Sequence, residues 1–126
     1  MPNPRGVLVL IIDDEPDTCG IFEHYLTSQG FSVMCAYDGA QGLVTAKAAR
    51  PDAIVLDLGL PELDGWEVAR RLREDPATAS IPIVAVTAYA TGDARDRAFD
   101  AGVDSVLIKP CPPDALLNEI VSLRER

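Results

Sequence analysis

A chain of 126 residues provides one hydrophobic core, so we expect a single domain over residues 1–126 with its core at about 7–123. The formal net charge of −9 argues against nucleic acid or an anionic membrane as a partner, because the field of the protein repels both. Cys19, Cys35 and Cys111 have no CxxC spacing and cannot all pair, and no apolar run is long enough for a signal peptide or a membrane span. These features predict a soluble cytoplasmic protein.

Continuous apolar runs predict the buried strands. Residues 7–12 and 53–56 show no alternation between apolar and polar side chains, which is typical of strands covered on both faces of a parallel sheet. A less apolar strand at 31–35 is expected at a sheet edge. Two further strands are expected at 81–86 and 105–108.

Segments of helical periodicity separate these strands. Gly30 and Gly102 are suited to end the helices that precede them, and Ala94, Ala98 and Phe99 are predicted to form the inward face of the fourth helix. Strict alternation of strands and helices calls for right-handed crossovers and an α/β fold with helices on both faces of a parallel sheet. The expected helices cover residues 16–29, 64–74, 93–101 and, from Pro112 or Pro113, residues up to 123, and a further helix runs from about residue 40 and must stop before Pro51.

Polar residues stand where the apolar strands end. Because the carboxyl ends of parallel strands lie at one edge of the sheet, where open α/β folds bind ligands, we expect these side chains to converge. Gly59 and Pro61 keep the next helix several residues away from Asp57, which argues against Asp57 being only a helix cap. The strand-end residues are Asp13 and Asp14, Asp57, Thr87 and Lys109.

This set of side chains fits phosphoryl chemistry. Converging carboxylates repel one another and remain ionised only beside a cation, and Mg²⁺ is commonly held by carboxylates together with phosphoryl oxygens. Lys109 supplies a fixed positive charge and Thr87 a hydroxyl donor to the same oxygens. A carboxylate is also a competent nucleophile, and its product is an aspartyl phosphate.

The sequence resembles the receiver domain of two-component response regulators, most closely a stand-alone chemotaxis-type receiver, over about residues 7–123. The resemblance implies a flavodoxin-like, doubly wound (βα)5 fold with strand order 2-1-3-4-5. The motifs that carry it are Ile12-Asp13-Asp14-Glu15, residues 56–61 with Asp64-Gly65, Val86-Thr87-Ala88 and Ile108-Lys109-Pro110.

The resemblance also implies a role for each strand-end residue. Asp57 is the expected phosphoacceptor, supplied by a phosphohistidine of a sensor histidine kinase or histidine phosphotransfer protein, or by a small phosphodonor. Asp14, Asp57 and the backbone carbonyl of Gly59 are expected to ligate Mg²⁺ directly, with Asp13 acting largely through water. Thr87 and Lys109 are expected to contact the phosphoryl oxygens. A cis peptide is expected before the proline that follows Lys109.

The same resemblance predicts a signalling switch rather than an enzyme. A downstream effector protein is expected to read the face formed by the fourth helix, fifth strand and fifth helix. Val106 departs from the family pattern, because many receivers place an aromatic ring there, and Cys111 replaces a second aromatic after Lys-Pro. Tyr89 is either a cover for the acyl phosphate or part of a partner-binding face.

Several alternatives remain open on sequence grounds. The chain is a receiver acting on a separate protein, a relay to a histidine, or a fragment of a longer regulator or hybrid kinase. A constitutive interaction module of receiver fold has Val106 as its only support. An aspartyl phosphatase is disfavoured because Gly59 stands where its general acid belongs, and a flavin carrier is disfavoured because Asp13-Asp14-Glu15 repels a cofactor phosphate.

Overall fold

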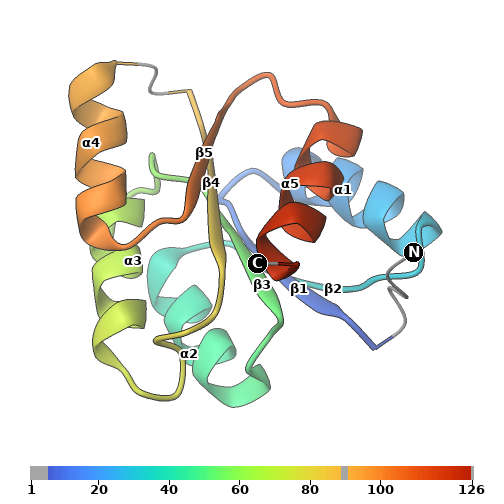
Figure 1. Cartoon of the computed structure of the whole chain (residues 1–126), viewed down its shortest axis with the longest axis horizontal. Helices are drawn as coiled ribbons and strands as arrows, with labels where there is room; N and C mark the ends of the chain where they lie inside the picture. The colour runs from blue at the N-terminus through green and yellow to red at the C-terminus, as the bar shows by residue number, and fades with distance from the viewer. Residues whose placement is uncertain (1–5, 89–90, 126) are drawn as a thin grey trace.

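The computed structural model describes residues 6–88 and 91–125, in which a five-stranded parallel sheet alternates with five helices (Figure 1). The strand order is β2-β1-β3-β4-β5, which confirms the expected flavodoxin-like α/β fold. In chain order the elements are β1 (Leu8–Ile12), α1 (Pro16–Ser28), β2 (Ser32–Ala36), α2 (Gly39–Ala49), β3 (Ala53–Leu56), α3 (Gly65–Glu74), β4 (Ile83–Thr87), α4 (Gly92–Ala101), β5 (Ser105–Ile108) and α5 (Pro113–Arg124).

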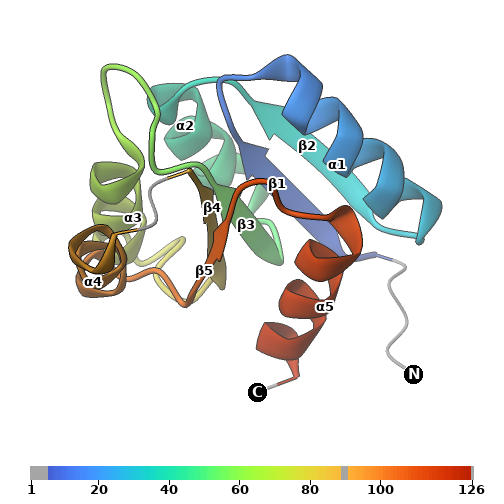
Figure 2. The same cartoon turned by 90° about the horizontal axis from the view of Figure 1, so that it is seen from above.

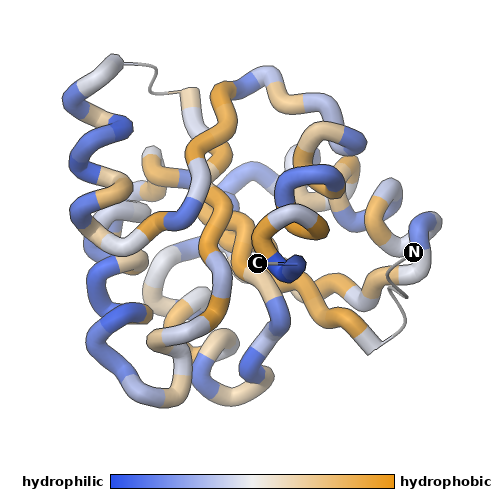
Figure 3. Tube along the Cα trace, viewed as in Figure 1, coloured by the Kyte–Doolittle hydropathy of each residue, from blue (hydrophilic) through white to orange (hydrophobic). Residues whose placement is uncertain are grey.

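The helices form two layers around the sheet. Figure 2 shows α1 and α5 on one face and α2, α3 and α4 on the other. Successive residues of β1 enter opposite cores: Leu10 and Ile12 pack in the cluster under α2, α3 and α4, whereas Val9 and Ile11 pack in the cluster under α1 and α5. The apolar strands therefore run through the middle of the molecule between more polar helices (Figure 3).

Local chemistry explains where several elements begin and end. Gly30 and Gly102 adopt left-handed φ angles of 96° and 109° at the ends of α1 and α4, as the sequence predicts. β4 begins at Ile83, later than residue 81, because the Ile81 N–H bonds to the Thr78 carbonyl in a turn. The edge position predicted for the second strand is confirmed.

One prediction about α4 is wrong. Ala94 and Ala98 face the core, but Phe99 is 45% exposed and lies outside the inward face. In a helix, residues four apart share a face, while the next residue is turned by about 100°. The buried stripe of α4 thus follows Ala94 and Ala98 and leaves the phenyl ring outside.

Within residues 6–88 and 91–125, none of the helices has the length and apolar character that a membrane span requires.

Candidate functional site

The central strands place two aspartates side by side. Ile12 and Leu56 are paired in the β1–β3 ladder, so the residues that follow them, Asp13 and Asp57, leave the sheet together. The backbone N–H of Asp57 donates to the Ile12 carbonyl at 3.0 Å, which continues the ladder to the aspartate itself. The strands thus deliver both side chains to one edge, as predicted.

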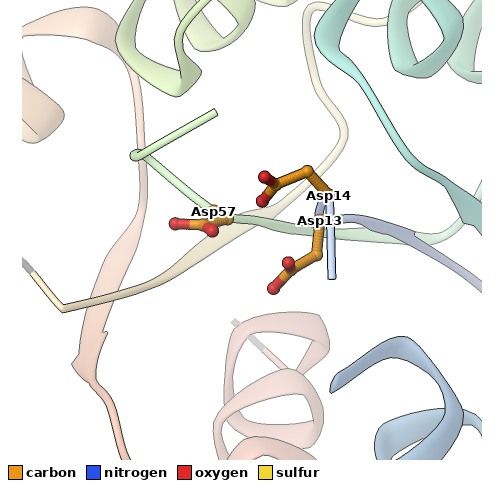
Figure 4. A group of neighbouring side chains, drawn as sticks. All are labelled: Asp13, Asp14 and Asp57. Atoms are coloured by element: carbon orange, nitrogen blue, oxygen red, sulfur yellow. The ribbon is translucent and has the colours of Figure 1, made fainter. Parts of the chain in front are cut away.

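Asp14 completes a group of three carboxylates (Figure 4). One ligand oxygen from each of Asp13, Asp14 and Asp57 lies within 4.8 Å of the others. Asp13 and Asp57 are buried, with 3% and 8% of their surface exposed, while Asp14 opens to solvent. An all-oxygen, partly solvated donor set of this kind fits a hard divalent cation that keeps some of its water.

Lys109 reaches this group from the end of β5. Its Nζ lies 3.2 Å from Oδ2 of Asp13 and 3.3 Å from Oδ2 of Asp57. The backbone N–H of Lys109 donates to the Thr87 carbonyl at 2.8 Å. The peptide between Lys109 and Pro110 is cis, as the family resemblance implies. A single ammonium therefore serves two buried carboxylates.

The ionisation of these groups reflects their burial and mutual contact. Burial raises the pKa of Asp13, against the lowering effects of the Glu15 N–H and of Lys109, and the Asp57 charge adds to the rise. Burial alone would lower the pKa of Lys109, but the attraction of Asp57 and Asp13 leaves it raised. Lys109 is accordingly a stable cation at neutral pH.

Two further predicted residues lie at the same carboxyl edge of the sheet. The backbone N–H of Gly59 donates to Oδ1 of Asp57 at 2.9 Å, so the loop after β3 folds over the side chain. Thr87 ends β4, between β3 and β5, and is fully buried. Val106 is partly buried against the core and provides no aromatic ring at its position. Tyr89 lies outside the described residues.

The structure adds two features that the sequence analysis did not assign. Gly65 packs on the Asp57 backbone so closely that a Cβ on Gly65 would lie 2.4 Å from the Asp57 carbonyl oxygen. The Asp64-Gly65 pair was the only signal for this contact. A groove of about 410 Å³ also opens beside Lys109 between α1 and the β5–α5 loop, lined by Thr18, Ile21, Phe22, Lys109, Pro110 and Cys111.

Comparison with known proteins gives one consistent result. The family model described as the response regulator receiver domain matches residues 9–121. The chain is 38% identical over 118 residues to the DNA-binding dual master transcriptional regulator RpaA of Synechocystis, covering 94% of this chain and 49% of RpaA. It is 37% identical over 124 residues to the transcriptional regulatory protein PrrA of Mycobacterium tuberculosis, a match that covers 98% of this chain and 51% of PrrA. The chain thus spans about half the length of these curated relatives.

A solved structure shares both the fold and part of the sequence. The receiver domain of the sensor histidine kinase PA1611 from Pseudomonas aeruginosa is 31% identical, with a TM-score of 0.88 over 96% of this chain and 99% of that one. That structure has a magnesium ion coordinated in its active site cleft.

Proposed function

The chain belongs to the response regulator receiver domain family, and we propose that Asp57 is the residue on which it accepts a phosphoryl group. The observation that carries this assignment is the position of the Asp57 carboxylate, which shares the Lys109 ammonium with Asp13 at the carboxyl edge of the sheet. A receiver is a phosphoryl-accepting signalling module and not a conventional enzyme, so the output of this chemistry is a change in protein contacts.

We assign the metal site to Asp13, Asp14, Asp57 and the backbone carbonyl of Gly59, with Mg²⁺ as the ion. The cluster of three carboxylate ligand atoms supports this assignment, as does the magnesium ion in the related PA1611 receiver domain. When bound, Mg²⁺ offsets negative charge on phosphoryl oxygens and orients them for in-line displacement. Asp13 is expected to act largely through water.

The chain's own residues account for the transfer. An Asp57 oxygen forms a bond to phosphorus while the phosphorus–nitrogen bond of a phosphohistidine breaks, and the bonding electrons leave with the imidazole nitrogen. Lys109 then exchanges its contact with Asp57 for a phosphoryl oxygen. Thr87 donates its hydroxyl to another phosphoryl oxygen. Lys109 and Thr87 make these contacts only after the phosphoryl group is on Asp57. The negative charge of the phosphoryl group thereby changes the structure around the site.

The donor we propose is a sensor histidine kinase or a histidine phosphotransfer protein. The apolar groove beside Lys109 gives such a partner a surface next to Asp57, with Ile21 (59% exposed) at its edge. We propose that a downstream effector protein binds the face of α4, β5 and α5, where Phe99 is exposed. Because Cys19, Cys35 and Cys111 are all unpaired, a reducing cytoplasm is the compartment we assign.

Intact mass after incubation with acetyl phosphate tests the assignment. We expect a gain of one phosphoryl group with Mg²⁺ and none with chelator or in Asp57→Asn. Asp96→Asn, which neutralises an exposed carboxylate on α4, is the matched control and should be labelled like the parent. Labelling of Asp57→Asn to the parental level would refute Asp57 as the acceptor.

A second candidate, a constitutive interaction module, has a specific observation in its favour. Val106 provides no ring to move between the site and the effector face. This alternative requires that partner binding be identical for the parent and Asp57→Asn, with and without acetyl phosphate and Mg²⁺. A phosphorylation switch requires that acetyl phosphate and Mg²⁺ change partner binding in the parent and leave it unchanged in Asp57→Asn.

A further inference from the structure

Within residues 6–88 and 91–125, α4 packs only small side chains into the core. Its buried side chains are those of Ala94 and Ala98, whereas the neighbouring α3 buries larger residues, including Val68 and Leu72. Small side chains bury little surface, so they contribute correspondingly little to fixing a helix. Polar contacts at the two ends of α4 therefore have a large share in setting its position.

At its C-terminal end, α4 is fixed by Arg73 of α3. The Nε of Arg73 donates to the Gly102 carbonyl at 2.9 Å, and one terminal nitrogen bonds to Oδ2 of Asp104 at 2.8 Å. The same carboxylate oxygen accepts from the Ile83 N–H at 2.8 Å. Arg73 thereby ties this end of α4 both to α3 and to the start of β4.

In its N-terminal half, α4 is held by Trp66. The indole Nε1 of Trp66 donates to the Ala94 carbonyl at 3.1 Å. The guanidinium carbon of Arg97 lies 4.3 Å from the centroid of the indole ring, a cation–π contact. Trp66 thus contacts α4 through both a backbone carbonyl and a side chain. Both contacts lie on the N-terminal side of Ala98, toward the end of α4 that is nearer to Thr87 in the chain.

Trp66 is also directly connected to the phosphoacceptor segment. It follows Gly65, whose N–H donates to the Leu58 carbonyl at 3.0 Å and whose Cα packs against the Asp57 backbone. Backbone atoms at such close approach cannot move independently. The backbone that leads into Trp66 is therefore held against that of Asp57, while the carbonyl that the indole N–H contacts belongs to α4, the helix that follows Thr87 in the chain.

We propose that Trp66 couples the phosphorylation state of Asp57 to the position of α4. The inference rests on the proposed function, in which Thr87 donates its hydroxyl to a phosphoryl oxygen, and it adds that this bond draws Thr87 and the start of α4 toward the phosphoryl group. The C-terminal end of α4 stays anchored by Arg73, so the displacement falls on its N-terminal half, and the bond from Trp66 to Ala94 is the contact that opens. Trp66 would thus link Asp57 to α4 in a chain whose Val106 provides no aromatic ring.

Removing the bond should make the switched state easier to reach. Trp66→Phe keeps a ring for Arg97 but loses the N–H donor. If the bond exists only in the unphosphorylated arrangement, its loss removes a penalty on switching and tightens Mg²⁺-dependent beryllofluoride binding by roughly three- to tenfold. Calorimetric titration measures this affinity. Tyr37→Phe, which removes a polar group from an exposed ring elsewhere, is the matched control and should leave the affinity unchanged.

The indole N–H itself gives a second measurement, which uses the unaltered protein. Trp66 is the single tryptophan, so a ¹⁵N-labelled sample shows one indole resonance. We expect its exchange with solvent to accelerate when beryllofluoride and Mg²⁺ saturate the site, and not in Asp57→Asn.

The outcomes separate this inference from the proposed function. Unchanged or weaker beryllofluoride affinity in folded Trp66→Phe, or unchanged indole exchange in the saturated parent, overturns the coupling role while leaving Asp57 as acceptor. A parent that takes up neither a phosphoryl group nor beryllofluoride overturns both.

Discussion

The ammonium nitrogen of Lys109 lies 3.3 Å from Oδ2 of Asp57, although the two residues end strands that are separated by β4. The same nitrogen is 3.2 Å from Oδ2 of Asp13. Two buried carboxylates therefore depend on one side chain for charge balance wherever Mg²⁺ is not bound. This sharing makes the stability of the fold and the chemistry of the site inseparable.

Lys109→Ala should destabilise the metal-free protein while leaving Mg²⁺ binding intact. It removes a hydrogen-bonded cation from two buried carboxylates, at a cost of about 2 kcal/mol in the free energy of unfolding. Mg²⁺ should restore much of this loss, because it binds only the folded state. Urea unfolding in chelator and in Mg²⁺ measures the loss of stability and its recovery. We also expect phosphorylation of this variant to produce a smaller change in partner binding than in the parent.

Lys47→Ala is the control for that experiment. Lys47 forms an ion pair of 3.6 Å with Asp75, but its side chain is 69% exposed, so its removal should change stability little in either buffer. Equal losses for the two lysine variants would show that the buried contacts of Lys109 carry no special weight.

Asp13→Asn should stabilise the metal-free fold at neutral pH, because burial disfavours the charged carboxylate, and should weaken Mg²⁺ binding. Burial raises the pKa of Asp13, so as pH rises above the ordinary value of 3.8 the unfolded chain loses its proton first and the fold loses stability. The asparagine variant avoids this loss. Its advantage should therefore be small near about pH 3 and grow toward neutrality, as urea unfolding at several pH values will show. A constant advantage across that range would exclude the ionisation of Asp13 as its cause.

Much of this site could be predicted from sequence because buried parallel strands are continuous apolar runs. Each run stops abruptly at a polar residue, so Asp13, Asp57 and Lys109 mark strand ends without any knowledge of strand order. Their meeting at one edge then follows from the parallel arrangement alone. The order of the strands did not follow from the pattern and came only from the family resemblance.

What the sequence could not predict depends on contacts between distant elements. Phe99 is apolar, yet whether it faces the core depends on how α4 is rotated over the sheet. The bond between Trp66 and Ala94 joins residues 28 positions apart on helices whose relative placement no local pattern encodes. The close approach of Gly65 to Asp57 likewise appears only once the loop is folded.

Cys19 should resist alkylation in the native protein. Burial raises the pKa of its thiol, and the contact with Cys35 raises it further, so little thiolate forms at neutral pH. Residue Cys19 is also only 1% exposed, whereas Cys111 lines the groove beside Lys109. Iodoacetamide labelling followed by peptide mass mapping should modify Cys111 before Cys19 and all three cysteines in urea. Modification of native Cys19 as fast as Cys111 would contradict the packing of α1 on the sheet.

Gly65→Ala and Gly20→Ala should have opposite effects, although both replace a glycine within a helix. A Cβ at Gly65 would lie 2.4 Å from the Asp57 carbonyl oxygen and 2.5 Å from the Leu58 Cα, and backbone atoms cannot move aside cheaply. We expect a loss of roughly 2–4 kcal/mol in the free energy of unfolding, together with slower labelling of Asp57 by acetyl phosphate.

Gly20 provides the matched comparison, because nothing lies within 4 Å of a Cβ at that position in α1. Alanine there should stabilise the protein by about 0.5–1 kcal/mol, since glycine loses more backbone freedom on entering a helix. Its labelling rate should match that of the parent. Urea unfolding and intact mass measure both variants side by side. A Gly65→Ala protein as stable and as rapidly labelled as the parent would mean that α3 is not held against Asp57, which would also remove the physical basis for coupling through Trp66.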